Sequence, residues 1–117
     1  MQSKEFRIRK QKDFDHIFGK GGSFCSQGFL AVKLVPNELT HSRFGFIVSN
    51  KISKSAVKRN RIKRLLRESV RLRWMQINPG FDVVMMARAD VSEKSFEDVD
   101  KAVDSLLKKS GLGTVPK

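Results

Sequence analysis

The stretch AVKRNRIKRLLRESVR, residues 56–71, most constrains what this chain can fold into. Drawn as a helix at about 100° per residue, it separates apolar side chains from cationic ones. The predicted inner side comprises Ile62, Leu65, Leu66, Ser69 and Leu72. The predicted outer side comprises Asn60, Arg64, Arg67 and Arg71. We therefore expect a helix over about 55–75 that is anchored to a core while aiming its charge outward.

This outward charge has few counter-ions of its own. Acidic partners at i,i+4 are nearly absent, and like charges at that spacing destabilise a helix. The whole chain carries 24 Lys and Arg against 12 Asp and Glu, a formal net charge of +12. A charged helix side is ordinarily just a solvated face, but this one favours a polyanion, most simply a nucleic acid. Guanidinium groups suit that partner because they can bond two phosphate oxygens and stack on bases.

Apolar patterns outside this helix predict a small α+β fold, one mixed sheet covered by helices in a single domain over 1–117. Ser95, with Asp98 three residues later, is expected to form a capping pair for the last helix. The N-terminal part is expected to contain a basic arm over about 1–9, a short helix with Phe14, Ile17 and Phe18 that ends at Gly19, and a turn over 19–23. Strands are expected over 29–35 and 43–49, before the long helix, and over 81–87, after it. The chain is expected to end with a helix over 95–109 and a frayed tail over 111–117.

The sequence shows no catalytic constellation and no metal-binding spacing. His16 and His41 are isolated, and the single Cys25 fits a buried or edge-strand thiol. The carboxylates from Asp98 to Asp104 suggest a solvated acidic face, and Trp74 is expected to pack rather than to stack on RNA. No apolar run is long enough for a membrane span, and the N-terminus lacks a secretory signal, so we expect a cytoplasmic protein.

The basic helix and the residues before it resemble the signature of the bacterial ribonuclease P protein family. The stretch SAVKRNRIKRLLRE is preceded by RFGFIVSNKISK, and the order of predicted elements also fits that family over nearly the whole chain. The matching positions are Ser53, Ala56, Arg59, Asn60, Arg61, Ile62, Lys63, Arg64 and Arg67.

The resemblance implies a fold, an activity and partners. The expected fold is an α–β sandwich with a left-handed β-α-β crossover around the signature helix, although right-handed crossovers are the general rule. The expected role is the protein subunit of a bacterial ribonucleoprotein endonuclease that removes the 5′ leader from precursor tRNA. The resemblance implies that the RNA subunit performs the hydrolysis with Mg²⁺. The protein alone is expected to be inactive and to join the RNA as a monomer.

The resemblance also implies two RNA-binding surfaces. The signature helix and the residues before it are expected to contact the RNA subunit through Ser49, Lys51, Arg59, Asn60, Arg61, Lys63, Arg64 and Arg67, and the outward stripe adds Arg71. A cleft between the first helix and the sheet is expected to hold the single-stranded leader through Arg7, Phe14, Phe18 and Val32. The family often has Tyr at the last of these positions, whereas this chain contains no Tyr. A Phe pair at i,i+4 also suits a core, so both readings of Phe14 and Phe18 stay open.

Two other functions are compatible with parts of the pattern. A non-catalytic RNA-binding module, such as a ribosomal protein, would have a similar composition. A DNA-binding regulator could place the basic helix in a major groove, but a predicted strand stands where a helix-turn-helix partner would be needed.

Overall fold

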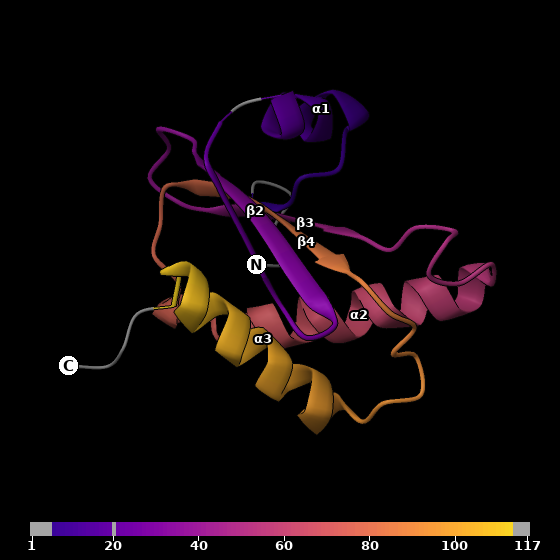
Figure 1. Cartoon of the computed structure of the whole chain (residues 1–117). Coiled ribbons are helices and arrows are strands. Elements are labelled where there is room, and N and C mark those ends of the chain that lie inside the picture. The colour runs from indigo at the N-terminus through magenta and orange to yellow at the C-terminus, as the bar shows by residue number, and fades with distance from the viewer. Residues whose placement is uncertain (1–5, 20, 114–117) are drawn as a thin grey trace.

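The described residues of the computed structural model, 6–19 and 21–113, form a mixed sheet of four strands (Figure 1). The strands are β1 (Ser23–Gln27), β2 (Leu30–Pro36), β3 (Arg43–Ile47) and β4 (Phe81–Ala87), in the spatial order β1-β2-β4-β3. β2 pairs antiparallel with both β1 and β4, whereas β3 pairs parallel with β4. The apolar runs had predicted three of these strands, and the structure confirms them within a few residues.

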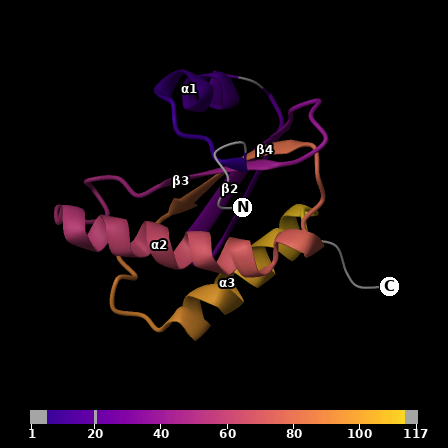
Figure 2. The same ribbon diagram turned by 180° about the vertical axis from the view of Figure 1, so that it is seen from behind.

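Three α-helices cover the sheet on its two faces. α1 (Gln11–Gly19) lies on one face, and α2 (Ala56–Leu72) and α3 (Phe96–Ser110) lie on the other, as Figures 1 and 2 show from opposite sides. We call these the α1 face and the α2/α3 face of the sheet. The predicted single α+β domain is confirmed. α2 connects the neighbouring parallel strands β3 and β4, as expected for a β-α-β crossover, and the left hand of that crossover stays a prediction.

The alternation of side chains along β2 assigns residues to the two faces. Leu30, Val32 and Leu34 belong to the main core under α2 and α3. Val35 belongs to a smaller core under α1, together with Ile8, Ile17 and Val84. Because β2 and β4 are the central strands, both of their faces are covered, which explains the continuous apolar run in β4.

α2 begins and ends much as the sequence predicts. The Ser55 side chain accepts a hydrogen bond from the backbone N–H of Lys58 (3.2 Å), which caps the first turn. The regular helix ends at Leu72 and is followed by a 3₁₀ helix, η2 (Trp74–Gln76). Trp74 packs as expected, with its ring centroid 5.8 Å from that of Phe44.

The inner side of α2 differs from the prediction at its end. Ile62, Leu66 and Ser69 are fully buried, but Leu72 is 58% exposed and the unpredicted Val70 is fully buried. At 100° per residue, Leu72 lies about 60° beyond Ser69, outside the arc that the sheet and α3 cover. The buried arc is therefore rotated toward Val70, and the assignment of Leu72 to the inner side was wrong.

Residues 7–8 and 111–113, near the two limits of the described ranges, are joined to the rest of the fold. Arg7 forms a parallel bridge with Phe44, and the backbone N–H of Ile8 donates to the Phe44 carbonyl (2.8 Å). This confirms an extended arm at residues 7–8, while residues 1–5 of the predicted arm lie outside the described residues. The predicted fraying is wrong for residues 111–113, because Leu112 is fully buried and Gly113 bridges Ile77; the rest of the predicted tail is not described.

Candidate nucleic-acid interface

The outward side of α2 presents part of the predicted basic stripe to solvent. Asn60 and Arg64 are exposed, and Arg67 is half-buried. α2 can hold them in this orientation because Ile62, Leu66 and Val70 anchor the helix to the main core. These three outward residues therefore share one side of a rigid element, as a surface that reads phosphates requires.

Arg67 is the centre of a cluster of like charges, which we call the Arg7–Arg64–Arg67 cluster. Burial, followed by the charges of Arg7 and Arg64, lowers the pKa of Arg67. Its Nε atom is buried and has no hydrogen-bond partner within the described part of the chain. Guanidinium groups close enough to influence one another's charge create a positive potential, which a phosphate would relieve. The cluster joins the N-terminal arm to α2, a proximity that spacing along the sequence does not reveal.

Other cations of the signature are turned toward the protein itself. Arg59 donates from Nη1 to the Ser53 carbonyl (2.9 Å), and Arg61 donates from Nε to the Ser92 carbonyl (2.6 Å). Arg71 forms an ion pair with Glu68, and its Nε lies 3.0 Å from Oε2 of that carboxylate. Glu68 thus neutralises the charge of Arg71, while Arg59 and Arg61 keep their charges but are partly engaged by backbone carbonyls. The predicted stripe is therefore not uniformly available.

The remaining predicted positions of this surface lie before and within α2. Ser49 and Lys51 are exposed, and Lys63 is half-buried. The Ser49 carbonyl accepts a hydrogen bond from the backbone N–H of Ile52 (3.0 Å), which folds the chain into the turn that leads to α2. Lys51 is thereby held in the segment between β3 and the signature helix.

The two phenylalanines of α1 have different surroundings. Phe14 packs against the smaller core and covers Gly45 so closely that a Cβ there would lie 2.6 Å from the Phe14 ring. Phe18 is 46% exposed. Phe14 therefore packs against the smaller core while staying half-buried, whereas Phe18 keeps an aromatic surface open to solvent at the end of α1.

Val32 does not lie in a cleft beside α1, contrary to the prediction. Its side chain is fully buried in the main core, on the α2/α3 face of β2. Its neighbours Ala31 and Lys33 project from the α1 face instead, because side chains alternate along a strand. Val32 is thus a core residue that an RNA strand cannot reach.

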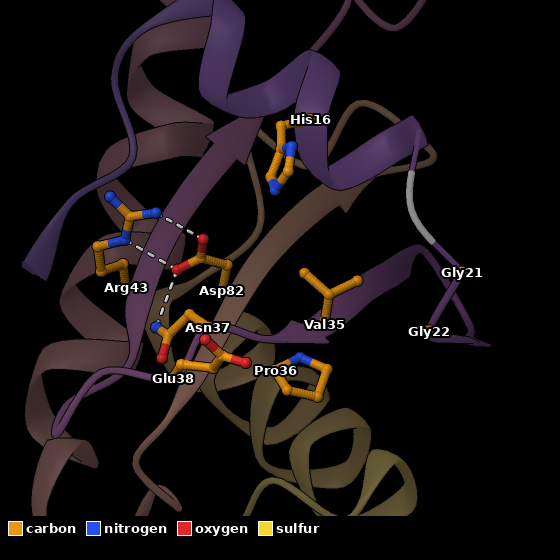
Figure 3. A pocket seen from close by; sticks show the side chains of 9 residues that line it. All are labelled: His16, Gly21, Gly22, Val35, Pro36, Asn37, Glu38, Arg43 and Asp82. Carbon is orange, nitrogen blue, oxygen red and sulfur yellow. Dashed lines mark hydrogen bonds and ion pairs between the residues drawn. The ribbon is translucent and has the colours of Figure 1, made fainter.

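A pocket of about 500 Å³ opens on the α1 face near the end of β2 (Figure 3). Its lining includes His16 from α1, Glu38 from the turn after β2, and Gly22. Arg43 and Asp82 form an ion pair in its wall, with Nε 2.8 Å from Oδ1 and Nη2 2.5 Å from Oδ2. The pocket is therefore mixed in charge, unlike the Arg7–Arg64–Arg67 cluster.

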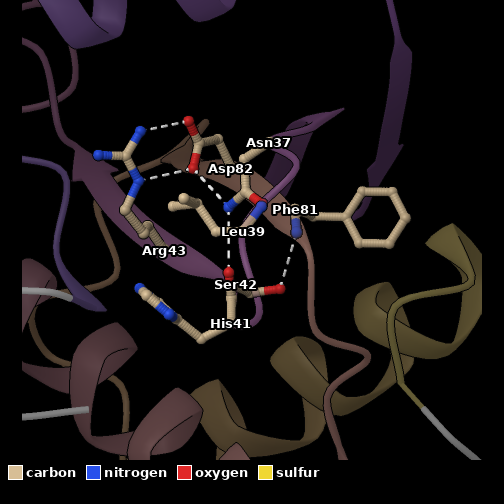
Figure 4. Close-up of polar contacts among 7 residues, drawn as sticks. All are labelled: Asn37, Leu39, His41, Ser42, Arg43, Phe81 and Asp82. Atoms are coloured by element: carbon tan, nitrogen blue, oxygen red, sulfur yellow. Dashed lines mark hydrogen bonds and ion pairs between the residues drawn. The ribbon is translucent and has the colours of Figure 1, made fainter.

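Asp82 organises the strand ends around this pocket (Figure 4). It is 4% exposed, and it also accepts a hydrogen bond from Asn37 Nδ2 (3.0 Å). Burial alone would raise the pKa of Asp82, but the hydrogen bonds from Arg43 and Asn37 and the charge of Arg43 outweigh it and lower the pKa below 3.8. Ser42 adds a hydrogen bond from the Phe81 backbone N–H (3.0 Å). These contacts fix the turn after β2 to the starts of β3 and β4.

The acidic residues of α3 are not simply a solvated face, which corrects the prediction. Arg73 donates to Asp100 (2.6 Å) and to Asp104 (3.0 Å), and the Ser69 hydroxyl donates to Asp100 (2.6 Å). The carboxylates therefore fasten α3 to the end of α2. Among residues 6–19 and 21–113, no group of three His, Cys, Asp or Glu side chains is placed to hold a metal ion. No helix in those ranges is long and apolar enough to cross a membrane.

Comparison with known proteins gives consistent matches. The family model described as Ribonuclease P matches residues 2–111. The ribonuclease P protein component of Clostridium botulinum (strain Loch Maree / Type A3) is 40% identical over 110 residues, which cover 93% of this chain and 97% of the relative. That of Syntrophomonas wolfei is 41% identical over 112 residues, covering 96% of this chain and 92% of the relative.

Solved structures agree with these sequence matches. The Staphylococcus aureus RNase P protein superposes with a TM-score of 0.82 at 29% identity, covering 93% of this chain and 98% of that protein. The Thermotoga maritima RNase P protein superposes with a TM-score of 0.78 at 33% identity, covering 88% and 96%.

Proposed function

This chain belongs to the ribonuclease P protein family, and from that premise we propose that it assists leader removal from precursor tRNA as a non-catalytic subunit. It partners the ribonuclease P RNA. In the proposed complex, the outward side of α2 lies against the RNA subunit and the α1 face guides the single-stranded 5′ leader. The protein contributes binding and positioning, and the RNA performs the phosphodiester hydrolysis.

The Arg7–Arg64–Arg67 cluster is the observation that carries this proposal. Cations of this kind ordinarily meet carboxylates inside a folded protein, yet the buried Nε of Arg67 has no hydrogen-bond partner among the described residues. The pKa of Arg67 is also lowered by burial and then by the charges of Arg7 and Arg64. RNA phosphates supply the missing negative charge, and each neutralised phosphate releases condensed counter-ions. We infer that Arg64 and Arg67, with Asn60 beside them, form the principal contact with the RNA subunit.

The predicted leader contacts change at Phe14, Val32 and Arg7. Phe18 remains a candidate for base stacking because of its exposed ring. Phe14 supports it from the smaller core, and Val32 is withdrawn. Arg7 belongs with the α2 surface through its proximity to Arg67.

Mg²⁺ enters the proposal as a cofactor of the RNA subunit. The described residues offer no suitable cluster of metal ligands, so no step is assigned to a metal held by this protein. We also propose that the protein acts as a single copy within a cytoplasmic ribonucleoprotein.

A cleavage assay tests the proposal directly. The cognate ribonuclease P RNA is incubated with 5′-labelled precursor tRNA at low Mg²⁺, with and without the protein. The protein alone should release no leader, and its addition to the RNA should increase kcat/KM. An absence of stimulation, combined with co-purification of ribosomal RNA, would instead favour a ribosomal RNA-binding role.

A further inference from the structure

Phe24 is an exposed aromatic residue to which neither the sequence patterns nor the proposed function assigns a role. It lies in β1 and is 63% exposed. Among the exposed large hydrophobic side chains of the described ranges, Phe18 and Phe24 are the aromatic ones. A phenylalanine that is exposed to this extent gains only part of its burial energy, so much of its ring surface is available to a partner.

The strand register places Phe24 on the same face of the sheet as α1. Phe24 pairs with Lys33 of β2, and Lys33 pairs with Val84 of β4. Residues directly opposite each other in antiparallel strands project from the same face. Val84 is fully buried in the smaller core under α1, so Phe24 and Lys33 also project from the α1 face.

Phe18 lies in the last turn of α1, a few residues before β1 in the chain. α1 ends at Gly19 and β1 begins at Ser23, so only a short connection separates the two aromatic residues. Six residues of chain reach at most about 20 Å, which limits the separation of Phe18 and Phe24. Both rings therefore lie within a span that a few nucleotides of an extended single strand can cover.

The chemistry between the two rings suits RNA. Lys33, which is half-buried, stands directly opposite Phe24 and adds a cation to the row. Stacking of bases on aromatic side chains combined with cationic contacts to phosphates is how single strands are held. The chain has no Tyr and Val32 is buried, so Phe18 and Phe24 are the exposed aromatic side chains that the described residues offer for stacking.

We propose that Phe24 stacks on a base of the 5′ leader, beyond the base that contacts Phe18, with Lys33 binding the phosphate between them. This inference rests on the proposed function and adds a positioning residue to it. It places the more distant part of the leader over β1, at the edge of the sheet. A protein partner on the same ring is the competing use of this surface.

The test measures how leader length affects affinity. The holoenzyme is assembled with wild-type protein or with Phe24→Ala, and Kd is measured for precursor tRNAs whose leaders increase one nucleotide at a time. Loss of one stacked base should weaken binding about 5- to 150-fold once the leader reaches Phe24. Shorter leaders should bind wild type and variant equally. Phe24→Trp should retain the affinity for long leaders, because it preserves a stacking surface.

Three further measurements keep the outcome decisive. Leu39→Ala is the matched control, because Leu39 is also exposed (44%) but lies in the turn after β2; it should leave every Kd unchanged. 2-Aminopurine placed at successive leader positions should be quenched at one position by wild type and Phe24→Trp, and not by Phe24→Ala. If Phe24→Ala does not fold, Phe24→Leu, which keeps apolar volume without an aromatic face, replaces it and should show the same length-dependent loss.

Distinct results would overturn the two proposals. Equal affinities of wild type and Phe24→Ala for all leaders, in a holoenzyme that the protein stimulates, would overturn the role of Phe24 alone. An equal loss of affinity for every precursor tRNA, and for tRNA that has no leader, would assign the Phe24 ring to the RNA subunit or to another partner. That result would also overturn the proposed role of Phe24. If the wild-type protein failed to stimulate the RNA at all, the proposed function would fall first.

Discussion

The two faces of the sheet differ in how completely helices cover them. On the α2/α3 face, Val32, Met85 and Leu66 are fully buried in one continuous core. On the α1 face, a short helix covers part of the surface, and the side chains of Phe18 and Phe24 stay exposed. The same strands thus supply stability through one set of alternating residues and a candidate RNA surface through the other.

This division makes the strand register important for function. A slip of β2 by one residue would exchange Val32 with Lys33 and turn every side chain to the opposite face. The Arg43–Asp82–Asn37 contacts and the main core both oppose such a slip, because they fix specific residues of β2, β3 and β4 together.

The largest expected effect lies in the closed core of the α2/α3 face. Leu66→Ala should cost about 2–5 kcal/mol in the free energy of unfolding, because it leaves a cavity under α2. Phe18→Ala on the more open α1 face should cost clearly less. Urea unfolding followed by circular dichroism measures both. Equal losses would break the contrast between the two faces.

A somewhat smaller effect is expected from the charged anchor of the α1 face. Asp82→Asn should cost about 1.5–3 kcal/mol at neutral pH, the usual contribution of hydrogen bonds to charged groups. The pKa of Asp82 is lower in the folded state than in the unfolded state, where it is near 3.8. The ionised Asp82 therefore stabilises the fold fully above the unfolded pKa, and this stabilisation is lost as the pH falls through the folded pKa. Wild type and variant should therefore converge in stability below about pH 4, which thermal unfolding from about pH 2 to 7 would detect.

Glu38→Gln is the matched control for this measurement. Glu38 is an exposed carboxylate that lines the same pocket. The control should keep the wild-type dependence of Tm on pH. A constant difference between wild type and Asp82→Asn down to about pH 2 would contradict the assigned sign.

The assignment of Val32 to the closed face can be sharpened with a larger side chain. Val32→Tyr should destabilise the fold by about 1–3 kcal/mol, because the core has no room for the ring. Lys33→Tyr, one residue along and on the α1 face, should change stability little. Chemical denaturation of the pair measures the difference. A stable Val32→Tyr variant with tighter leader binding would restore Val32 to the leader cleft.

The smallest effect on stability, and the clearest on salt dependence, is expected outside both faces. Replacing Arg64 and Arg67 with Ala should leave the fold intact and reduce the slope of log K against log salt by about 0.7–0.9 for each lost phosphate contact. Filter binding of the ribonuclease P RNA between about 50 and 200 mM salt measures the slope. Lys101→Ala with Lys109→Ala removes equal charge from α3 and should change the slope less. An unchanged slope in the arginine variant would place these side chains away from the RNA.

Much of this fold could be predicted because its strongest patterns are local. The apolar run of β4, the periodicity of α2 and the cap formed by Ser95 depend on neighbouring residues and needed no tertiary information. β1 was missed because it is an edge strand whose residues, SFCSQ, lack the apolar alternation of a covered strand. Its existence depends on pairing with β2.

The candidate site was predictable only in part, for a related reason. Sequence spacing placed Asn60, Arg64 and Arg67 on one side of a helix, but the approach of Arg7 to Arg67 depends on the arm pairing with β3. Val32 was assigned through resemblance, and only the register decided which face it occupies. The carboxylates of α3 likewise needed the position of Arg73 before their role could be seen.

The pairing of the N-terminal arm with Phe44 has a consequence for solubility. β3 is an outer strand of the sheet, and an unpaired outer strand can recruit another chain through its free backbone groups. The arm occupies part of that ladder at Arg7 and Ile8. Its cations also repel a second copy. A single segment thus discourages self-association and contributes a guanidinium to the surface that the polyanion would occupy.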